Sequence, residues 1–503
     1  MATLQDYRNE RLKKLEQLRS LGVDPFPAKS ARTIGAGEVV SRFNEINGQT
    51  ETVSGRIKSI RKFGKLAFIV IRDFSGEVQL FIRAGEIGEL SVAGGELGIT
   101  ELNLLDTGDF IEATGPVIKT QTGEVSIGVQ KLRILTKSLR PMPLGHEEFS
   151  DKEERLRRRY VDMNVNLEVR ERFVRRAKFW QATRQFLLNE GFIEINIPVL
   201  EHTTGGADAN PFATHMDALN QDFYLRISHE LPLKRLIGAG YERVFDIGPR
   251  FRNEGVDEEH LPEHVAMESY AAFESYEWGM DFYERMIKYV CQETWGKLQF
   301  EHNGITVDLS GEWRRVKYAD ILRDKFDVDV FSPDIEQLKQ ILVNAHIEFD
   351  PNANAERLLD NVWKLIRKNE AGPFWLIQEP AAISPLAKRS PEDPRVTERF
   401  HPIIFGTEMG NGFSELNDPI DQLNRFQEQQ EKRDAGDAEA MMLDIDFVEM
   451  LEYGMPPTCG WGNSERNFWL FEGVSAREGV PFPHMKHEIS ETTRKIYPDV
   501  RFE

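Results

Sequence analysis

Cysteine is nearly absent from this chain of 503 residues, which contains only Cys291 and Cys459. Two cysteines cannot form the disulfide framework of a small secreted protein, and they favour a reducing compartment. Cysteine and histidine are also too sparse and scattered to predict a structural zinc site. The N-terminus lacks the charged and then apolar pattern of a signal peptide. We therefore expect a cytoplasmic protein.

Long apolar runs are missing too, since no stretch approaches the ~20 residues that cross a bilayer, so no membrane partner is expected. The length predicts two or three domains.

The net charge of −20 argues against nucleic-acid coating, and DNA is not an expected partner, although a local basic face leaves room for RNA. Neither a GxxxxGK[ST] loop nor GxGxxG occurs, so any ATP site would lie on an antiparallel sheet.

Residues 51–135 have the pattern of a small β-barrel, such as an oligonucleotide-binding (OB) fold. Basic residues and the aromatic Phe63 and Phe68 occur close together in this segment. Aromatic side chains on a basic barrel face stack unpaired bases. Alternatively, Phe68 belongs to the core and the charges form a solvated edge. The five predicted strands are Val53–Ile57, Leu66–Ile71, Val78–Ile82, Phe110–Val117 and Val125–Leu135.

The domain organisation follows from composition. Residues 1–148 are predicted to form an N-terminal domain, in which an amphipathic helix over 3–20 either docks on the barrel or faces RNA. A polar stretch from Pro141 to Glu154 is typical of a linker. Residues 149–503 mix helices and strands: an amphipathic helix is predicted from about 168 to 190 and a strand at 192–197. Residues 243–247 and 263–273 alternate like antiparallel strands, and a helical insertion is predicted near 330–372.

Two acidic stretches carry the strongest functional signal. The first starts with Phe251-Arg252-Asn253-Glu254-Gly255 and continues through Pro262-Glu263 to Met267-Glu268-Ser269-Tyr270. The second runs from Glu408 through Asn411-Gly412-Phe413-Ser414-Glu415 to Asp418. Carboxylates gather at a cost, because like charges repel unless a cation lies between them. These stretches predict a bound metal ion, an ammonium ligand, or both.

With these residues the chain resembles the bacterial lysyl-tRNA synthetases of class II along nearly its whole length. Aspartate and asparagine relatives would be expected to carry FRDED in place of FRNEG. The resemblance implies an α+β protein: a five-stranded OB-fold barrel followed by a catalytic domain on an antiparallel sheet flanked by helices. Further matching segments are the helix that leads to Pro198, Gly205-Gly206-Ala207, His229-Glu230-Leu231 and Ser384-Pro385-Leu386-Ala387-Lys388.

The resemblance implies that L-lysine reacts with ATP to give lysyl-adenylate and pyrophosphate, after which lysine passes to the 3′ end of tRNA(Lys). It also implies a Mg²⁺ cofactor and a homodimer. Lysine carries one carboxylate and two ammonium groups, so its pocket should offer more anions than cations. The lysine-binding residues that the resemblance implies are Gly206, Glu230, Glu268, Tyr270, Asn411, Phe413 and Glu415.

The resemblance assigns the remaining roles residue by residue. In-line attack on a phosphate depends mainly on positioning and charge neutralisation, and the implied catalytic residues are Arg252, Glu254 and Arg466. Those three residues would also bind ATP, together with His260, His264 and Glu408, and Glu408 would hold Mg²⁺. In the barrel, the implied anticodon-binding residues are Arg56, Phe68, Gln79 and Glu124.

Three departures from the family pattern fall on the nucleotide side. His401 replaces a second metal-binding glutamate, although Mg²⁺ prefers oxygen ligands. His264 replaces a phenylalanine that stacks on adenine. The family's Gly-Leu-Gly-x-Gly-x-Asp-Arg is one residue short here and lacks a glycine that allows close approach to the nucleotide. The corresponding segment of this chain is Gly460-Trp461-Gly462-Asn463-Ser464-Glu465-Arg466.

Two hypotheses follow from these departures. In the first, the enzyme is active, and His401 either binds metal or, when protonated, neutralises phosphate charge. In the second, the chain is a catalytically weakened paralogue that binds lysine or tRNA. Transfer of a lysine-like group to a protein is disfavoured, because such relatives lack an anticodon barrel. Retention of Arg252, Glu254, Glu408 and Glu415 together favours the active enzyme.

Overall fold

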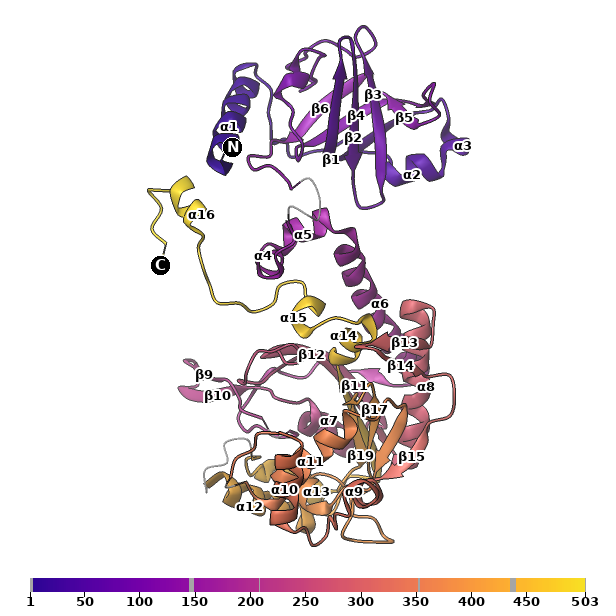
Figure 1. The fold of residues 1–503 in the computed structure, drawn as a ribbon, viewed down its shortest axis with the longest axis vertical. Helices are drawn as coiled ribbons and strands as arrows, with labels where there is room; N and C mark the ends of the chain where they lie inside the picture. Colours follow the sequence, from indigo (N-terminus) through magenta and orange to yellow (C-terminus); the bar gives the residue numbers. More distant parts are fainter. Residues whose placement is uncertain (1–2, 144–148, 208, 352, 435–439, 503) are drawn as a thin grey trace. The chain divides into compact units, whose positions relative to one another are not determined.

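The computed structural model describes residues 3–143, 149–207, 209–351, 353–434 and 440–502. The chain forms two compact units, one of Met1–Ser150 with Lys486–Glu503 and one of Asp151–Met485 (Figure 1). The sequence interpretation placed the C-terminal segment with the second unit instead. Part of the predicted linker, residues 144–148, lies outside the described residues. Within the described ranges, no helix combines the length and apolar character needed to span a bilayer.

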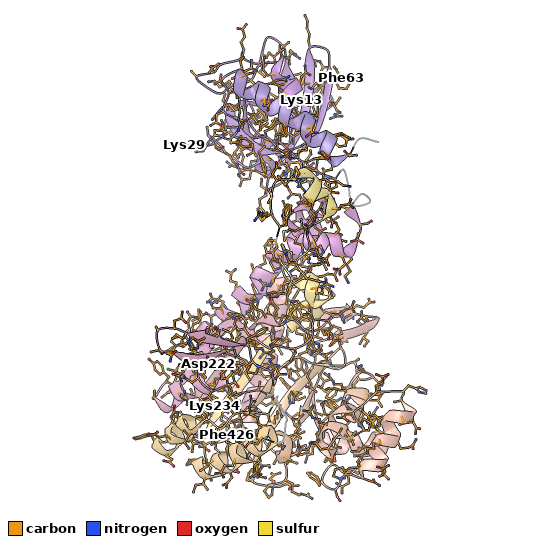
Figure 2. All side chains as sticks on the ribbon, turned by 90° about the vertical axis from the view of Figure 1, so that its left-hand side faces the viewer. Lys13, Lys29, Phe63, Asp222, Lys234 and Phe426 are labelled. Carbon is orange, nitrogen blue, oxygen red and sulfur yellow. The ribbon has the colours of Figure 1, made fainter. Side chains whose placement is uncertain are left out.

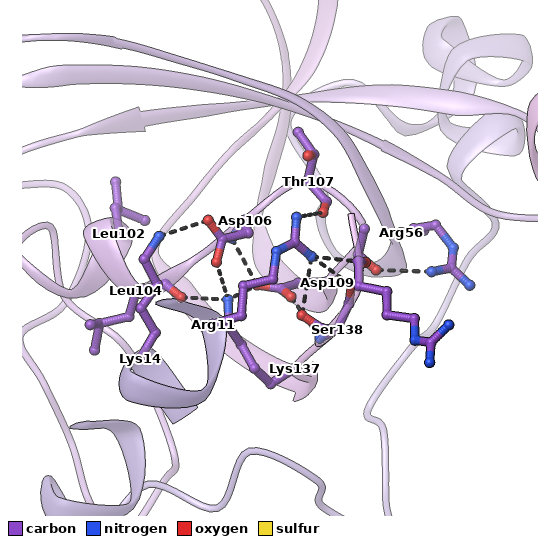
Figure 3. Close-up of polar contacts among 12 residues, drawn as sticks. Arg11, Lys14, Arg56, Leu102, Leu104, Asp106, Thr107, Asp109, Lys137 and Ser138 are labelled. Carbon is purple, nitrogen blue, oxygen red and sulfur yellow. Dashed lines mark hydrogen bonds and ion pairs between the residues drawn. The ribbon is translucent and has the colours of Figure 1, made fainter. Parts of the chain in front are cut away.

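The first unit opens with helix α1, Leu4–Ser20, close to the predicted range of 3–20. Thr3 accepts a hydrogen bond from the Asp6 amide while Asp6 accepts one from the Thr3 amide, which forms a capping box. Arg11 is 6% exposed and fixes the helix to the barrel. This buried arginine agrees with the docked alternative for the helix. Its guanidinium donates to the carbonyls of Thr107, Ser138 and Arg140 (Figure 3).

The barrel is closed because β1 pairs with both β2 and β4, which completes the ring β1-β2-β3-β5-β4. The predicted OB-fold barrel is confirmed. The last predicted strand was wrong as one element, since the structure divides it into β5 and β6. The strands are β1 Thr50–Phe63, β2 Leu66–Arg72, β3 Glu77–Arg83, β4 Phe110–Lys119, β5 Val125–Gly128 and β6 Lys131–Thr136. The helices of this unit after α1 are α2 Ala36–Ser41, α3 Phe43–Ile46, η1 Glu101–Leu104 and α16 Glu491–Ile496.

A buried lysine holds one end of the barrel together. The Lys137 side chain is fully buried, and its Nζ donates to Asp106 at 2.6 Å and Asp109 at 2.7 Å (Figure 3). Leu104 accepts a third hydrogen bond from the same ammonium at 2.8 Å. Burial raises the pKa of the Asp109 carboxyl despite the opposing charge of Lys137. Buried carboxylates of this kind need a paired cation to remain ionised.

The second unit is built on a large sheet, mostly antiparallel, with the order β15-β16-β17-β19-β20-β12-β11-β7. The predicted antiparallel pair around the first acidic stretch is present as β11 and β12. The predicted strand at 192–197 is shorter, because only β7 adopts strand geometry before Pro198. The strands of the sheet are β7 Ile193–Glu194, β11 Arg243–Phe251, β12 Glu263–Ala272, β15 Arg314–Lys317, β16 Phe374–Ile377, β17 Arg399–Ile404, β18 Thr407–Glu408, β19 Asn411–Ser414 and β20 Thr458–Ser464.

Helix α8 covers one face of this sheet through aromatic stacking. Alternation along β20 points Trp461 toward α8, where its ring stacks on Tyr283 at 4.6 Å and on Phe400 at 5.7 Å. The flanking Gly460 and Gly462 then face the opposite side of the sheet. The aromatic core on one face therefore leaves an open, glycine-lined surface on the other.

Helices surround the sheet, and the long helix predicted at 168–190 is α6. The predicted insertion contains α10 and α11, which share their own apolar core with α9 around Trp363. The helices of this unit are α4 Lys152–Arg157, α5 Arg159–Val165, α6 Leu167–Asn189, α7 Glu230–Gly238, α8 Tyr276–Trp295, α9 Tyr318–Phe326, α10 Ile335–Asn344, α11 Ala355–Arg367, η3 Ala381–Ile383, α12 Pro419–Asp434, α13 Ile445–Tyr453, α14 Arg466–Glu472 and α15 Ala476–Gly479. Two smaller sheets consist of β8 Leu200–Glu201, β9 Ala213–Met216 and β10 Gln221–Leu225, and of β13 Gln299–His302 and β14 Ile305–Asp308.

Replacement of Lys137 by methionine tests the buried charge network of the barrel. Loss of the ammonium leaves the buried Asp109 without its ion-pair partner, while Asp106 keeps only Lys14, so Lys137→Met should destabilise the first unit by about 3–5 kcal/mol. Urea unfolding followed by circular dichroism measures the change. The control is Lys13→Met, because Lys13 lies exposed on α1 and should contribute less than about 1 kcal/mol (Figure 2). Equal stability of the two variants would contradict the role of Lys137.

Candidate active site

The second unit contains a cavity of about 350 Å³ on the glycine-lined face of its sheet. The carboxylates of Glu230, Glu268 and Glu415 all line this one cavity. Other predicted site residues along its wall are Gly206, Arg252, Tyr270, His401, Glu408, Asn411, Phe413 and Arg466. The described residues that line it do not include the predicted Glu254, His260 and His264.

Strand register brings the acidic residues together. Glu268 and Tyr270 alternate onto the same face of β12, and they lie opposite Gly462 and Gly460 of β20. A Cβ at position 460 would overlap the Glu415 carboxylate and come within 2.5 Å of the Tyr270 ring. Glycine at 460 therefore makes the room in which the Glu415 and Tyr270 side chains meet.

Glu268 is the most strongly hydrogen-bonded carboxylate of the cavity. Its Oε1 accepts from Ser228 Oγ at 2.8 Å and from the His229 amide at 3.1 Å, and its Oε2 accepts from Tyr270 OH at 3.2 Å. Burial alone would raise the pKa of Glu268, but the His229 hydrogen bonds and the charge of Arg250 lower it to about 2. Glu268 is therefore a fixed negative charge at neutral pH.

Glu230 and Glu415 share a buried ammonium. Lys234 Nζ donates to Glu230 Oε1 at 2.5 Å and forms an ion pair with Glu415 Oε2. Burial, together with the neighbouring carboxylates, raises the pKa of both glutamates, and most strongly that of Glu415. The same two carboxylates raise the pKa of Lys234 against the effect of its burial. These two carboxylates therefore gain protons at higher pH than Glu268 does.

Cationic side chains also line the cavity, and Arg250 lies 3.8 Å from the Glu268 carboxylate. Arg250 and Arg252 line the cavity from β11 and the residue after it. Burial and the charge of Arg252 lower the pKa of Arg250 to about 9, so it stays protonated at neutral pH. Arg399 of β17 donates to Asn411 Oδ1 at 2.9 Å, which leaves the Asn411 NH₂ as its remaining donor. Adjacent guanidinium groups of this kind favour an anionic ligand such as a carboxylate or phosphate.

The residues around Glu408 do not fit a magnesium site made of two carboxylates. The Nδ1–H of His401 donates to the Gly410 carbonyl at 3.0 Å, and its Nε2 lies 3.4 Å from Glu379 Oε2. Glu408 accepts from Trp363 Nε1 at 2.7 Å. Across the described residues, no group of three or more His, Cys, Asp or Glu side chains is arranged to hold a metal ion. Glu408 thus offers one carboxylate, while both His401 nitrogens face protein groups.

The barrel presents Phe68 on its outer surface. Ala67, Ile69 and Ile71 of β2 point into the core, so alternation turns the half-buried Phe68 outward. The Phe68 ring lies 5.3 Å from that of Phe81, its cross-strand neighbour on β3. The alternative that Phe68 belongs to the barrel core is therefore wrong.

The other predicted barrel residues lie on three further parts of the barrel, β1, β3 and the turn before β5. Arg56 of β1 stacks over the Phe110 ring at 4.3 Å. Gln79 of β3 donates to Ser126 Oγ at 3.0 Å, two positions from Phe81 on the same strand face. Glu124 is exposed just before β5. Stacking rings next to amide and charged groups form a surface suited to unpaired bases.

Comparisons with known proteins agree with both sites. Residues 151–486 match the family described as tRNA synthetases class II (D, K and N). The chain belongs to this family of class II tRNA synthetases. Residues 51–135 match the OB-fold nucleic acid binding domain. A synthetase relative from Thermotoga maritima, named lysine–tRNA ligase, is 40% identical over 491 residues, which are 96% of each chain.

Two further synthetase relatives carry the same name. The protein from Roseiflexus sp. (strain RS-1) is 42% identical over 490 residues, which cover 96% of this chain and 99% of the relative. The protein from Moorella thermoacetica is 39% identical over 481 residues, which cover 95% of this chain and 97% of the relative. The similarity therefore spans both units of the synthetase.

Histidines near the synthetase site are held by neighbouring groups. His264 Nε2 accepts from Arg250 Nε at 2.7 Å, and its Nδ1–H donates to the Leu261 carbonyl at 3.2 Å. Burial and the arginine charges lower the pKa of His264 well below its usual value, so the ring is neutral. His260 is exposed and pairs with Asp257 at 2.9 Å.

The segment of residues 460–466 is one residue shorter than the family pattern, but its arginine still lines the synthetase cavity. Glu465 is buried and accepts hydrogen bonds from Arg176 of α6, the shortest at 2.5 Å. This pair anchors the strand end, after which Arg466 begins α14 and lines the cavity. Arg466 forms an ion pair with Glu259, which lies in the loop between β11 and β12.

Sequence reasoning missed three charged residues that shape the synthetase site. Lys234 follows Glu230 by four residues on α7, which puts both side chains on one helix face. Arg250 precedes Arg252 by two residues in a strand, and Arg399 likewise precedes His401, so each pair shares a strand face. Helical and strand periodicity applied to the recognised residues would have found all three.

Two glycine variants in β20 test the packing beneath the acidic residues. Gly460→Ala should destabilise the catalytic unit by about 1–3 kcal/mol, because the new methyl group collides with Glu415 and Tyr270. Gly462→Ala is the matched control in the same strand, since its nearest neighbour would be Glu268 Cγ at 3.2 Å. Thermal unfolding should show the larger loss for Gly460→Ala. Equal losses would contradict the packing at 460.

Proposed function

We propose that this chain is a lysine–tRNA ligase, which activates L-lysine with ATP and transfers it to the 3′ end of tRNA(Lys). The observation that carries the proposal is a single cavity lined by three carboxylates and by guanidinium groups. Lysine bears two ammonium groups and one carboxylate. Its charges therefore complement those of the cavity lining, and the family supplies the reaction class.

In the proposed position of lysine, each charged group of the substrate meets side chains of the opposite charge. Glu415 and Tyr270, supported by Glu268, hold the side-chain ammonium, and Phe413 packs on the aliphatic stem. A neutral analogue would leave buried carboxylates unpaired, which is a strong basis for rejecting it. The arrangement therefore selects the charge of the side chain.

The α-amino end is placed by Gly206 and Glu230. Gly206 has a φ of 83°, and a Cβ there would lie 2.7 Å from the Glu230 Cβ, so glycine permits a close approach. Arg252 and the Asn411 NH₂ hold the carboxylate of lysine. That carboxylate is the nucleophile that attacks the α-phosphate of ATP.

Activation rests on positioning and charge neutralisation. Arg252 neutralises charge at the reacting phosphate, and Arg466 binds the outer phosphates. Glu254 and His260 contact ATP from the loop after β11, and His264 supports the adenine end beside Arg250. Glu408 would hold the Mg²⁺ that accompanies ATP, and the ion would supply charge neutralisation at the phosphates. His401 is not assigned as a ligand.

The barrel supports binding of the other substrate. Arg56, Phe68, Gln79 and Glu124 recognise the anticodon of tRNA(Lys), with Phe68 stacking on an unpaired base. The proposed organisation is thus an anticodon-binding N-terminal domain and a catalytic domain, assembled as a homodimer.

Lysine-dependent exchange of pyrophosphate into ATP tests the proposed function. The chain should catalyse exchange with L-lysine and give only background rates with leucine or norleucine, which lack the second ammonium. Titration calorimetry measures lysine binding in parallel. Lysine binding without exchange above background would support the weakened paralogue and overturn the proposal.

The pH dependence of lysine use follows from the two coupled carboxylates. Because the pKa values of Glu230 and Glu415 are raised from 4.5, these groups are protonated further toward neutral pH than ordinary glutamates. Protonation removes the charge that binds ammonium, so KM for lysine should rise as pH falls from neutrality toward 4.5, by up to about tenfold per pH unit and at higher pH than ordinary glutamates would cause. KM for ATP is the control and should change less. A flat lysine KM over this range would contradict the assignment.

His401→Glu tests the metal side of the cavity. The variant gathers carboxylates at positions 379, 401 and 408, which should bind a divalent cation more tightly. We expect its melting temperature to rise with added Mg²⁺ by several degrees more than that of the unchanged chain, and its exchange reaction to need less Mg²⁺. His401→Gln controls for loss of the imidazole. An unchanged response to Mg²⁺ in both measurements would contradict a metal near His401.

A further inference from the structure

We propose that Lys234 is a positioning residue that fixes the spacing between the two ammonium subsites and so selects the length of the substrate amino acid. This inference rests on the proposed function. Lys234 bridges Glu230, assigned above to the α-amino group, and Glu415, assigned to the side-chain ammonium. One buried group therefore connects the two ends of the lysine site.

Lys234 acts from behind the cavity wall. The described residues that line the cavity include Glu230 and Glu415 but not Lys234, whose side chain is fully buried. Figure 2 labels Lys234 within the second unit. Its Nζ lies 5.2 Å from the centre of the Phe413 ring and 5.8 Å from that of Phe447. The substrate is therefore expected to meet the carboxylates and not the ammonium that holds them.

The bridge occupies one oxygen of each carboxylate. Glu230 gives its Oε1 and Glu415 its Oε2 to the ammonium. Within the described residues, neither Glu415 oxygen has a hydrogen-bond partner: Oε2 has only its ion pair with Lys234, whereas Oε1 has neither and lies over Gly460, a residue of the cavity lining. A buried carboxylate oxygen without a donor favours an incoming ammonium group. Lys234 thus orients Glu415 so that one oxygen remains for the ligand.

The bridge also joins two separate elements. Glu230 and Lys234 lie one turn apart on α7, whereas Glu415 follows β19. The Glu415 backbone is fixed independently, because its amide donates to the Thr458 carbonyl at 2.8 Å. The charged or titratable groups facing Lys234 and its two carboxylates include Glu268 and Tyr270 of β12, Arg399 of β17, Cys459 of β20 and Tyr283 of α8. Without the ammonium, repulsion would separate α7 from the strand end or one carboxylate would take up a proton.

Length selection follows from this fixed spacing. Ornithine is one methylene shorter than lysine, so it would have to draw the two subsites closer together to contact both carboxylates in the same way, and a bridge that holds them in place resists that movement. One methylene is worth about 1–3 kcal/mol in a rigid pocket, or roughly 10- to 200-fold in kcat/KM. A pocket whose two carboxylates are free to move would lose much of this discrimination.

Lys234→Met tests the bridge by pyrophosphate exchange with lysine and with ornithine. The ratio of kcat/KM values for lysine over ornithine should fall by about tenfold or more. The lysine KM profile should also move to higher pH, because an unbridged carboxylate holds its proton more tightly. KM for ATP should change less than about twofold. An unchanged ratio in a folded variant would overturn the inference.

Lys137→Met is a matched control. Lys137 is equally buried and also bridges two carboxylates, but it belongs to the barrel. This variant should lose stability without any change in the lysine-to-ornithine ratio. A fall in the ratio for Lys137→Met as well would mean that general destabilisation, and not the bridge, alters selectivity.

Lys234→Arg covers the case in which the methionine variant does not fold. Arginine keeps the positive charge but widens the bridge with its planar fork. The ratio should again fall, and an unchanged ratio would contradict control of spacing by Lys234. Failure of the proposed function can be told apart from failure of this inference, because the unchanged chain would then show no lysine-dependent exchange. In that event, the ratio of the affinities for lysine and ornithine, measured by calorimetry, tests the role of Lys234 in place of the ratio of kcat/KM values.

Discussion

The acidic site depends on pairing between buried charges. Three glutamates converge on one small cavity, and their mutual repulsion must be offset inside the protein before any ligand arrives. Lys234 offsets two of them, while hydrogen bonds from Ser228 and His229 stabilise the third. The result is a pocket with unequal carboxylates: Glu268 stays ionised, and the coupled pair of Glu230 and Glu415 responds to pH.

The sheet determines where the two signs of charge lie. β12 and β20 present Glu268, Tyr270 and two glycines on one face, while Trp461 anchors the opposite face against α8. β11 and the residue after it add Arg250 and Arg252 to the lining of the same cavity. A ligand with separated positive and negative groups is therefore oriented by the strands before chemistry begins, which suits a reaction that relies on positioning.

Much of the fold and of the acidic wall was predictable from local pattern. Alternation indicated the barrel and the β11–β12 pair, and the first acidic stretch identified Glu268 and Tyr270. Residues 192–197 did not form a full strand, since only two of them adopt strand geometry. The roles of Glu254, His260 and His264 remain predictions, and these three lie outside the described cavity lining.

The sequence by itself determined which charges are present, their helical and strand spacing, and the family pattern that they form. Tertiary structure decided which of those charges meet, because Lys234 and Glu415 are 181 positions apart in sequence and no local pattern connects them. It likewise decided that His401 faces Glu379 and the Gly410 carbonyl. Periodicity sets the face on which a side chain lies, but burial, pairing and pKa depend on neighbours that only folding supplies.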